Sequence, residues 1–261
     1  MHPEPSAARC LSARDIEHFI ANGFVRIDQA FPKAIAAEAR AILWQAMALS
    51  PDHPESWSRP VVRLGHFAQE PFRTAANMPT LHKAFDQLVG PGRWLPCGAV
   101  GTFPVRFPSA EDPGDTGWHV DVSFGTDHPD FMEWRANYQS RGRALLMLFL
   151  FSDTGPDDAP TRIRCGSHRV IAGQLKDAGE QGLTLRELAA SGFAESAHLP
   201  EAVATGEAGT VYLCHPFLAH SAQRHRGRVP RFLAQPPLLP RGECGLDFTG
   251  PLHPAERAVL S

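Results

Sequence analysis

Two residues with metal-binding side chains, His119 and Asp121, stand two positions apart in the segment 118–124. On an extended strand such residues point to the same side, so an imidazole nitrogen and a carboxylate oxygen would face one point. A second histidine would complete a two-histidine, one-carboxylate facial triad, which leaves three positions of an octahedral iron open. A His-x-Asp pattern is common by itself, and the alternative is a hydrogen-bonded His–Asp pair on a surface strand.

Two histidines, His215 and His220, compete for the remaining ligand position, and both follow the apolar run 211–213. They are five residues apart and would face opposite sides of a regular strand. Pro216 also interrupts the hydrogen-bond ladder next to His215, because proline lacks a backbone N–H. The pattern therefore favours His220 as the metal ligand and His215 as a packing or supporting residue.

An arginine, Arg231, follows His220 by eleven residues. The span 223–230 carries a glycine and a proline and is predicted to be a hairpin loop between strands at 219–222 and 232–235. In that hairpin, His220 and Arg231 lie on neighbouring antiparallel strands. The planar guanidinium is then placed to bind a carboxylate through two parallel hydrogen bonds.

The bulk composition is that of a globular protein and argues against several classes. The 261 residues are 43% hydrophobic and 20% charged, with a net charge of −3 and no basic stripe, so no nucleic-acid partner is expected. Five cysteines form no CxxC pair, which argues against a disulfide framework or structural zinc and fits a cytoplasmic location. No signal peptide is visible, and the longest apolar run, 144–151, is too short to cross a membrane. We therefore expect a cytoplasmic protein whose partner is a small molecule, with no membrane association.

The spacing of apolar residues along the chain changes near residue 94. Before it, helical spacing of apolar residues predicts helices from the capping residue Ser12 to Asn22, from Pro32 to at least Trp44, and over 80–89. Short strands are predicted at 24–27 and 61–64. After it, short apolar runs broken by glycine and proline predict strands at 97–107, 118–124, 144–152, 161–164, 210–214, 219–222 and 232–235, with one helix near 183–190.

These elements are expected to form one domain over 1–261. Residues 1–93 would be its mostly helical N-terminal part, with 1–10 as a frayed end. Residues 94–240 would be a barrel core, and 241–261 a C-terminal tail.

Four segments together resemble the phytanoyl-CoA dioxygenase-like family of iron(II)- and 2-oxoglutarate-dependent oxygenases. They are the helix, turn and strand at 16–27, the His119-Val120-Asp121 motif, the stretch from Asp153 to Gly166-Ser167-His168, and 215–220 with Arg231 eleven residues after His220. The step from histidine to arginine is the specific part. The resemblance implies a mainly β fold with flanking helices, built on a double-stranded β-helix, which is a jelly-roll, cupin-like barrel.

The resemblance also assigns roles to individual positions. It implies three ligands of Fe(II), namely His119, Asp121 and His220. It implies Arg231 as the partner of the distal carboxylate of 2-oxoglutarate, with Thr102 and Arg106, on one face of the preceding strand, as further candidates for cosubstrate binding. Ala222 departs from the family, because a serine that contacts the cosubstrate is common at this position.

The segment 125–142 is longer than in typical members of that family. A loop of this length is often a lid over a site, and the alternative is a solvated surface excursion. Within it, Trp134 is a candidate for contact with the substrate.

The activity that the resemblance implies couples oxidative decarboxylation of 2-oxoglutarate by O2 to hydroxylation of a small metabolite. Related halogenases lack the carboxylate ligand, so Asp121 favours hydroxylation over chlorination, with desaturation or ring formation as other outcomes. Two further classes remain: a non-oxidative cupin-like enzyme that uses zinc or manganese, and a catalytically silent binding module. Arg231 argues against the first, which needs no dicarboxylate partner, and the intact ligand set argues against the second.

Overall fold

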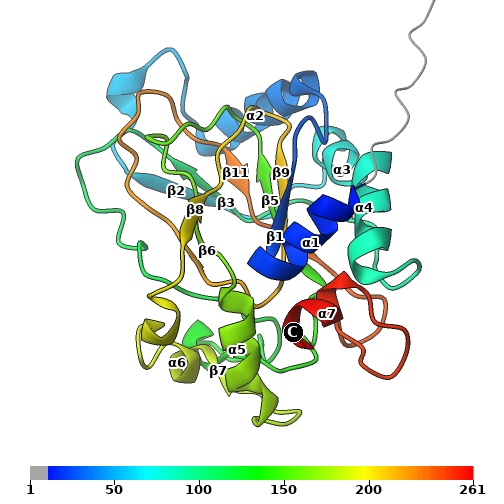
Figure 1. The fold of residues 1–261 in the computed structure, drawn as a ribbon. Helices are drawn as coiled ribbons and strands as arrows, with labels where there is room; N and C mark the ends of the chain where they lie inside the picture. Colours follow the sequence, from blue (N-terminus) through cyan, green and yellow to red (C-terminus); the bar gives the residue numbers. More distant parts are fainter. Residues whose placement is uncertain (1–10, 261) are drawn as a thin grey trace, which may run out of the picture.

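The computed structural model describes residues 11–260, so the expected frayed end at 1–10 lies outside the described residues. Two β-sheets form the centre of the molecule, and helices pack around them (Figure 1). The helices are α1 (Ala13–Asn22), α2 (Lys33–Met47), α3 (Glu70–Ala76), α4 (Pro79–Val89), α5 (Ser167–Lys176), α6 (Leu185–Leu188) and α7 (Pro254–Leu260), with 3-10 turns η1 (Pro54–Ser56), η2 (Phe131–Glu133) and η3 (Ala194–Ser196). Within 11–260, every helix is too short or too polar to span a bilayer.

The strands divide between a five-stranded sheet, a three-stranded sheet and two separate pairs. They are β1 (Phe24–Ile27), β2 (Val61–Leu64), β3 (Phe103–Arg106), β4 (Arg135–Ala136), β5 (Leu145–Leu150), β6 (Arg162–Arg164), β7 (Leu183–Thr184), β8 (Glu201–Val203), β9 (Val211–Cys214), β10 (His220–Ser221), β11 (Leu233–Ala234) and β12 (Pro237–Leu238). The larger sheet has the order β1-β9-β5-β11, with β12 also paired to β5. The smaller sheet has the order β10-β6-β8, and the pairs are β2-β3 and β4-β7.

The first helix and strand follow from local sequence, as predicted. Ser12 and Asp15 exchange the two hydrogen bonds of a capping box at the start of α1. Gly23 ends the helix in the left-handed conformation, with φ 83°, which glycine adopts without a Cβ clash. The chain then enters β1 at Phe24, and the predicted range 24–27 is confirmed.

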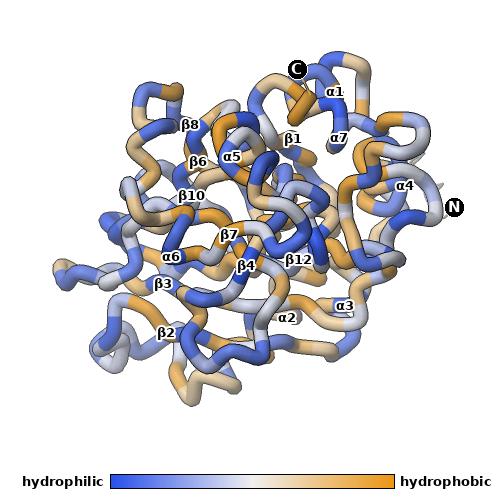
Figure 2. The backbone as a smooth tube through the Cα atoms, turned by 90° about the horizontal axis from the view of Figure 1, so that it is seen from below, coloured by the Kyte–Doolittle hydropathy of each residue, from blue (hydrophilic) through white to orange (hydrophobic). Residues whose placement is uncertain are grey.

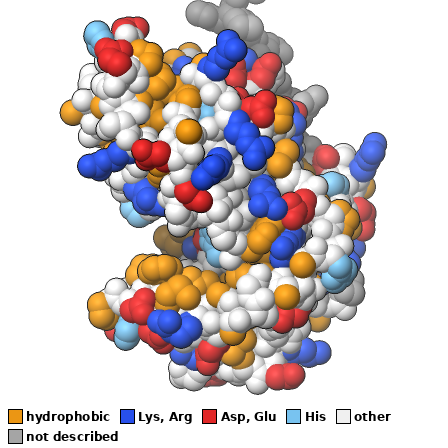
Figure 3. All heavy atoms as spheres, turned by 90° about the vertical axis from the view of Figure 1, so that its left-hand side faces the viewer, with side chains coloured by type: hydrophobic (Ala, Val, Ile, Leu, Met, Phe, Trp, Pro, Cys, Tyr) orange, Lys and Arg blue, Asp and Glu red, His pale blue; other side chains and the backbone are white. Residues whose placement is uncertain are grey.

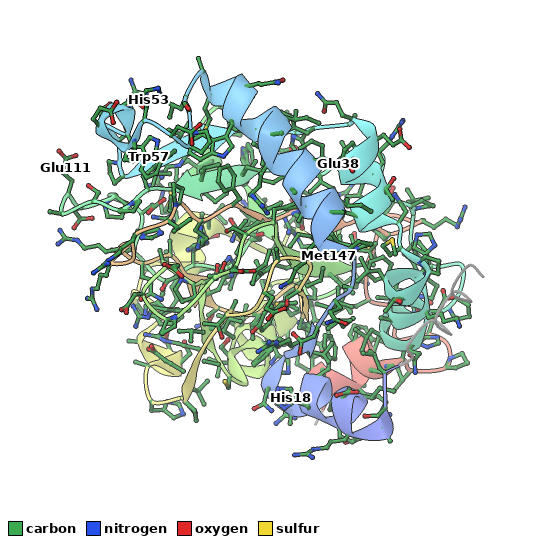
Figure 4. All side chains as sticks on the ribbon, turned by 90° about the horizontal axis from the view of Figure 1, so that it is seen from above. His18, Glu38, His53, Trp57, Glu111 and Met147 are labelled. Atoms are coloured by element: carbon green, nitrogen blue, oxygen red, sulfur yellow. The ribbon has the colours of Figure 1, made fainter. Side chains whose placement is uncertain are left out.

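The central strand β5 is the predicted apolar run, and all six of its residues are buried. Side chains alternate across it. Leu145, Met147 and Phe149 pack in the large cluster that includes the helices, whereas Leu146, Leu148 and Leu150 share a second cluster with Ile163 of β6. Met147 accordingly lies deep under α2 while Glu38 points outward from it (Figure 4). Figure 2 shows hydrophobic and hydrophilic residues alternating along the chain. The second cluster therefore fills the space between the two sheets, and the first joins the larger sheet to the helices.

The expected barrel is only partly realised. Within residues 11–260 the hydrogen-bonded ladders leave the two sheets separate, so no closed barrel forms. Helical residues also outnumber strand residues, so the description "mainly β" is wrong by content. The reason is that several predicted strands shorten to a few paired residues, and that α3, α5 and α7 were not anticipated.

Two of these differences concern segments with functional motifs. The segment 118–124 is not a strand, because only His119 and Phe124 form isolated bridges within it. The Gly-Ser-His motif at 166–168 follows β6 and starts the unanticipated helix α5, because Gly166, with φ 84°, turns the chain from the strand into the helix.

Candidate metal centre

His119 and His220 face each other across an antiparallel bridge. The N–H of His119 donates to the carbonyl of His220 over 3.0 Å, and the N–H of His220 donates back over 2.9 Å. His220 starts β10, which pairs with β6 of the smaller sheet. The bridge places the two imidazole rings side by side, with centroids 4.3 Å apart.

The three ligands predicted from sequence come together in the structure. His119, Asp121 and His220 each offer one ligand atom, and these atoms lie within 4.8 Å of one another. Asp121 reaches the cluster although its segment is irregular, so the shared direction of His119 and Asp121 survives without a regular strand.

Both histidines are oriented by their own backbone. Nδ1 of His119 lies 3.0 Å from the carbonyl of Gly117, and Nδ1 of His220 lies 3.0 Å from the carbonyl of Leu218. Because a carbonyl only accepts, each Nδ1 carries the proton and each Nε2 presents its lone pair. Nε2 of His220 is buried and has no hydrogen-bond partner among residues 11–260. A metal ion would satisfy this nitrogen, so the donor set fits Fe(II).

The charges around the cluster also suit a metal. Burial, with the charge of His119, lowers the pKa of His220 to about 4, so its ring is neutral at neutral pH and free to coordinate. Burial acts to raise the pKa of Asp121, but the positive charge of Arg143 and its hydrogen bond to the carboxylate outweigh it and hold that pKa below its usual value. Asp121 is therefore an anionic group beside the neutral ring of His220.

Arg143 is a site residue that the sequence analysis did not single out. Its Nη1 donates to Oδ2 of Asp121 over 2.9 Å, and its side chain is nearly buried. Oδ1 of Asp121 is left facing Nε2 of His220, 3.7 Å away. The only signal in the sequence was a charged residue directly before the apolar run 144–151, and that does not reveal a partner earlier in the chain.

Replacing Arg143 with Leu is expected to weaken Fe(II) binding by about 10- to 100-fold, the usual effect of removing a residue that orients a metal ligand. Without its hydrogen bond, Asp121 can rotate away from the two histidines. Anaerobic Fe(II) titration measures the change. Arg141→Leu is the matched control, because Arg141 is exposed and its ion pair with Glu243 is 3.8 Å long. Equal affinities for both variants would show that Arg143 does not position Asp121.

Trp118 holds the His119 segment against the smaller sheet. The guanidinium carbons of Arg162 and Arg164, both on β6, lie 4.6 Å and 4.0 Å from the centroid of its ring. Because β6 also pairs with β10, these cation–π contacts tie the segment that carries His119 to the sheet that carries His220. They replace the strand pairing that the segment 118–124 lacks.

Trp118→Ala is expected to weaken Fe(II) binding by roughly 5- to 30-fold, since each cation–π contact contributes about 0.5–1 kcal/mol. Trp118→Phe keeps an aromatic face and should recover most of the loss. Parallel Fe(II) titrations and thermal melts of the two variants test this. A loss of equal size in both would mean that the aromatic face is not what positions His119.

The residues expected to bind the cosubstrate line one cavity next to the triad. This cavity, of about 280 Å³, is lined by Thr102, Arg106 and Arg231 together with the candidate metal ligand His119. The predicted hairpin that was to bring Arg231 there is wrong, because β10 pairs with β6 and β11 pairs with β5. The chain crosses from one sheet to the other between them. Arg231 is placed instead by a backbone bridge to Arg106, with N–H to carbonyl distances of 2.8 Å and 3.1 Å.

This cavity, hereafter the smaller cavity, carries more positive than negative charge. Arg231 is buried, donates to the carbonyls of Ala159 and Pro104, and has no carboxylate partner within residues 11–260. Burial and the nearby charge of Arg106 lower the pKa of Arg231 to about 9, which leaves it charged at neutral pH. Arg106 pairs with Asp115 at 2.8 Å, and Asp115 also pairs with Arg63. Two guanidiniums thus share one carboxylate and that of Arg231 has none, so the cavity suits a ligand with negative charge.

The other two residues considered in the sequence analysis, His215 and Trp134, lie in different surroundings. His215 is fully buried, packs against His168 at 5.1 Å between ring centroids, and lies outside the triad, so its packing role is confirmed. Trp134 lines a second, larger cavity of about 570 Å³, to which His119 and Asp121 also contribute. The segment 125–142 is not a free excursion, since η2 and β4 lie within it and β4 pairs with β7.

Comparison with known proteins gives the fold. No family model and no curated protein matches the chain. SnoK, a non-haem α-ketoglutarate-dependent carbocyclase from nogalamycin biosynthesis, is similar with a TM-score of 0.55 and 16% identity over 88% of this chain and 85% of that one. HygX from Streptomyces hygroscopicus, with nickel and 2-oxoglutarate bound, gives 0.55 and 19% over 87% and 86%. GIG2 (DUF1479) from Candida albicans gives 0.59 and 14% over 88% and 64%.

The chain has the fold of 2-oxoglutarate-dependent enzymes. HygX has also been solved with iron bound. The HygX structures contain a metal and 2-oxoglutarate, and this chain contains the His119-Asp121-His220 cluster. The two observations are consistent with Fe(II) and 2-oxoglutarate as the metal and cosubstrate of this chain.

Proposed function

We propose that this protein is an Fe(II)- and 2-oxoglutarate-dependent oxygenase that hydroxylates a small molecule in the cytoplasm. The observation that carries the proposal is the buried, unpartnered Nε2 of His220 within a two-histidine, one-carboxylate cluster. The cavity that shares His119 with this cluster and holds surplus guanidinium charge supports the choice of a dicarboxylate cosubstrate. The fold shared with SnoK and HygX agrees with both points.

Each residue has a distinct part in this function. His119, Asp121 and His220 would hold the metal, and Arg143 orients Asp121 by donating a hydrogen bond to its Oδ2. Bound Fe(II), with 2-oxoglutarate and O2, supplies the oxidising power, which no side chain provides.

The cosubstrate is held by the smaller cavity. Arg231 binds the distal carboxylate of 2-oxoglutarate, and Arg106 adds a second positive charge beside it. The hydroxyl of Thr102 offers a further hydrogen bond to the cosubstrate.

The experiment that tests this function measures succinate release and O2 consumption with candidate substrates, with and without Fe(II) and 2-oxoglutarate. Turnover is expected to require both, to stop on chelation and to return on addition of Fe(II). A non-oxidative enzyme would turn over with zinc or manganese and no 2-oxoglutarate. A silent binding module would bind 2-oxoglutarate without releasing succinate.

Hydroxylation rather than chlorination is the expected outcome, because Asp121 keeps the position that chloride needs. Asp121→Gly should suppress hydroxylation by roughly 100-fold or more, since a ligand matters at least as much as the residues that orient it. Mass spectrometry of products formed with chloride and labelled oxygen measures this, with Asp112→Gly, an exposed acidic position, as the control. A chlorinated product from the unaltered protein would contradict the assignment.

A further inference from the structure

The larger cavity and the smaller cavity meet at the metal cluster. The larger cavity has a volume of about 570 Å³ and the smaller about 280 Å³. Both are lined by Thr102, His119 and Gln235, so the cluster lies at their junction. The proposed function fills the smaller cavity with 2-oxoglutarate. The larger cavity is then the place for the molecule to be oxidised.

The two cavities differ sharply in charge. The smaller has three arginines against one aspartate. Among residues 11–260, the carboxylates and guanidiniums that line the larger cavity are Asp121 and Arg143, and these two pair with each other at 2.9 Å. Its other titratable side chains are His119, which faces the metal position, and His66, which is exposed at the rim. The larger cavity therefore offers no unpaired charge to a substrate, and a charged group placed in it would lose water without gaining a partner.

The wall of the larger cavity is apolar on both sides. One side is formed by Phe131 of η2, by Trp134 directly after η2, and by Leu185 of α6. The other side is formed by Pro237 and Leu239. Phe131 is 59% exposed, a large aromatic surface beside a reactive site. Figure 3 shows this side of the molecule hollowed by a cleft, with hydrophobic side chains gathered along its lower lip. Such a concave apolar surface is typical of a binding site rather than of ordinary protein surface.

The aromatic side of this wall is held in place. Arg186 of α6 pairs with Asp130 and Glu133 on either side of Phe131, each at 2.7 Å. The backbone of Leu185 donates to the carbonyl of Trp134 over 2.8 Å. Nε1 of Trp134 donates to the carbonyl of His128 over 2.8 Å, so the only polar atom of this side chain is already satisfied. The indole is left with its apolar surface to offer a ligand.

We infer that the substrate is an uncharged, predominantly apolar molecule that carries a flat ring, bound against Phe131, Trp134 and Leu185. This inference rests on the proposed function for its choice of occupant. An acyl-CoA is excluded as substrate, because its phosphates require cationic partners that the larger cavity does not supply. Specificity comes from the apolar wall, while the charged cavity serves only the cosubstrate.

The test uses two probes with the same ring and different charge, 2-naphthol and 2-naphthoate, and octanoyl-CoA as a third. Each is titrated into the anaerobic protein loaded with Fe(II) and saturating 2-oxoglutarate, so that the smaller cavity is already filled. The readouts are the charge-transfer band of the iron–2-oxoglutarate complex and tryptophan fluorescence. We expect 2-naphthol to perturb both and to bind at least about tenfold more tightly than 2-naphthoate, with no perturbation by octanoyl-CoA.

Single substitutions test whether 2-naphthol binds at the apolar wall of the larger cavity. Trp134→Ala is expected to weaken binding of 2-naphthol by about tenfold, as for a central aromatic contact, and to leave the 2-oxoglutarate titration unchanged. Val229→Ala is the control, because Val229 is an exposed apolar residue of a different cavity. Tighter binding of 2-naphthoate or octanoyl-CoA, or unaltered binding of 2-naphthol by Trp134→Ala, would overturn the inference.

Failure of the proposed function gives a different result. The charge-transfer band would then be absent from the unaltered protein. Binding of 2-naphthol to the metal-free protein, followed by fluorescence and by the Trp134→Ala variant, would still show whether the apolar wall takes a neutral ring.

Discussion

His220→Ala protein is expected to lose Fe(II) binding, with an affinity lowered by more than about 100-fold, and to lose turnover with it. The change removes the buried Nε2 that has no other partner, and it leaves only His119 and Asp121 as ligands. Two protein ligands are too few to hold the metal tightly. Metal content per chain after anaerobic loading and desalting measures the effect directly.

The matched control is His215→Asn, five residues earlier in the chain. His215 packs against His168 and Phe217 and lies outside the cluster. This variant should melt at a lower temperature, because a buried side chain is changed, yet retain one Fe(II) per chain. If His215→Asn lost the metal while His220→Ala kept it, the ligand assignment would be wrong.

Arg231→Leu is expected to weaken 2-oxoglutarate binding by about 30-fold or more, because breaking a buried charge-assisted contact costs about 2–5 kcal/mol. Arg231 is 1% exposed and has no carboxylate partner within residues 11–260, so the ligand would supply its missing partner. Leucine fills similar space without charge or donors. Titration of 2-oxoglutarate into the anaerobic Fe(II) protein, followed by the charge-transfer band, measures the shift.

Arg228→Leu provides the comparison for this loss. Arg228 lies three residues earlier, is exposed and lines a different cavity. Its replacement should leave the titration unchanged. Equal titrations for Arg231→Leu and the unaltered protein would remove Arg231 from the cosubstrate site, and Arg106 would then be the remaining candidate.

The clustering of His119, Asp121 and His220 was predictable because most of its signal lies in short stretches of sequence. The separation of His119 and Asp121 fixes a shared direction, and Pro216 distinguishes His215 from His220. The same holds for α1 and β1, which a capping box and a left-handed glycine delimit. Such features involve residues a few positions apart, and so they can be recognised without knowledge of the fold.

Features that depend on distant pairing were missed. Arg143 acts through Asp121, and Asp115 acts through Arg106 and Arg63, so neither role is visible before the chain folds. The hairpin that was to join His220 to Arg231 also failed, because the choice of sheet for β10 and β11 depends on β6 and β5. Glycine and proline marked the turn correctly but could not specify the partner strands.

The arginine pair around Arg231 and Arg106 has a consequence for the end of each catalytic cycle. In the proposed function, succinate leaves the reaction with two negative charges, as 2-oxoglutarate enters with two, and it keeps the carboxylate that Arg231 is proposed to bind. The attraction that favours entry therefore opposes exit equally. Succinate lacks the keto group and therefore lacks a second ligand atom for the metal. Release of succinate then depends on its weaker contact with the metal. Because succinate keeps its contact with Arg231, it competes with 2-oxoglutarate for the site.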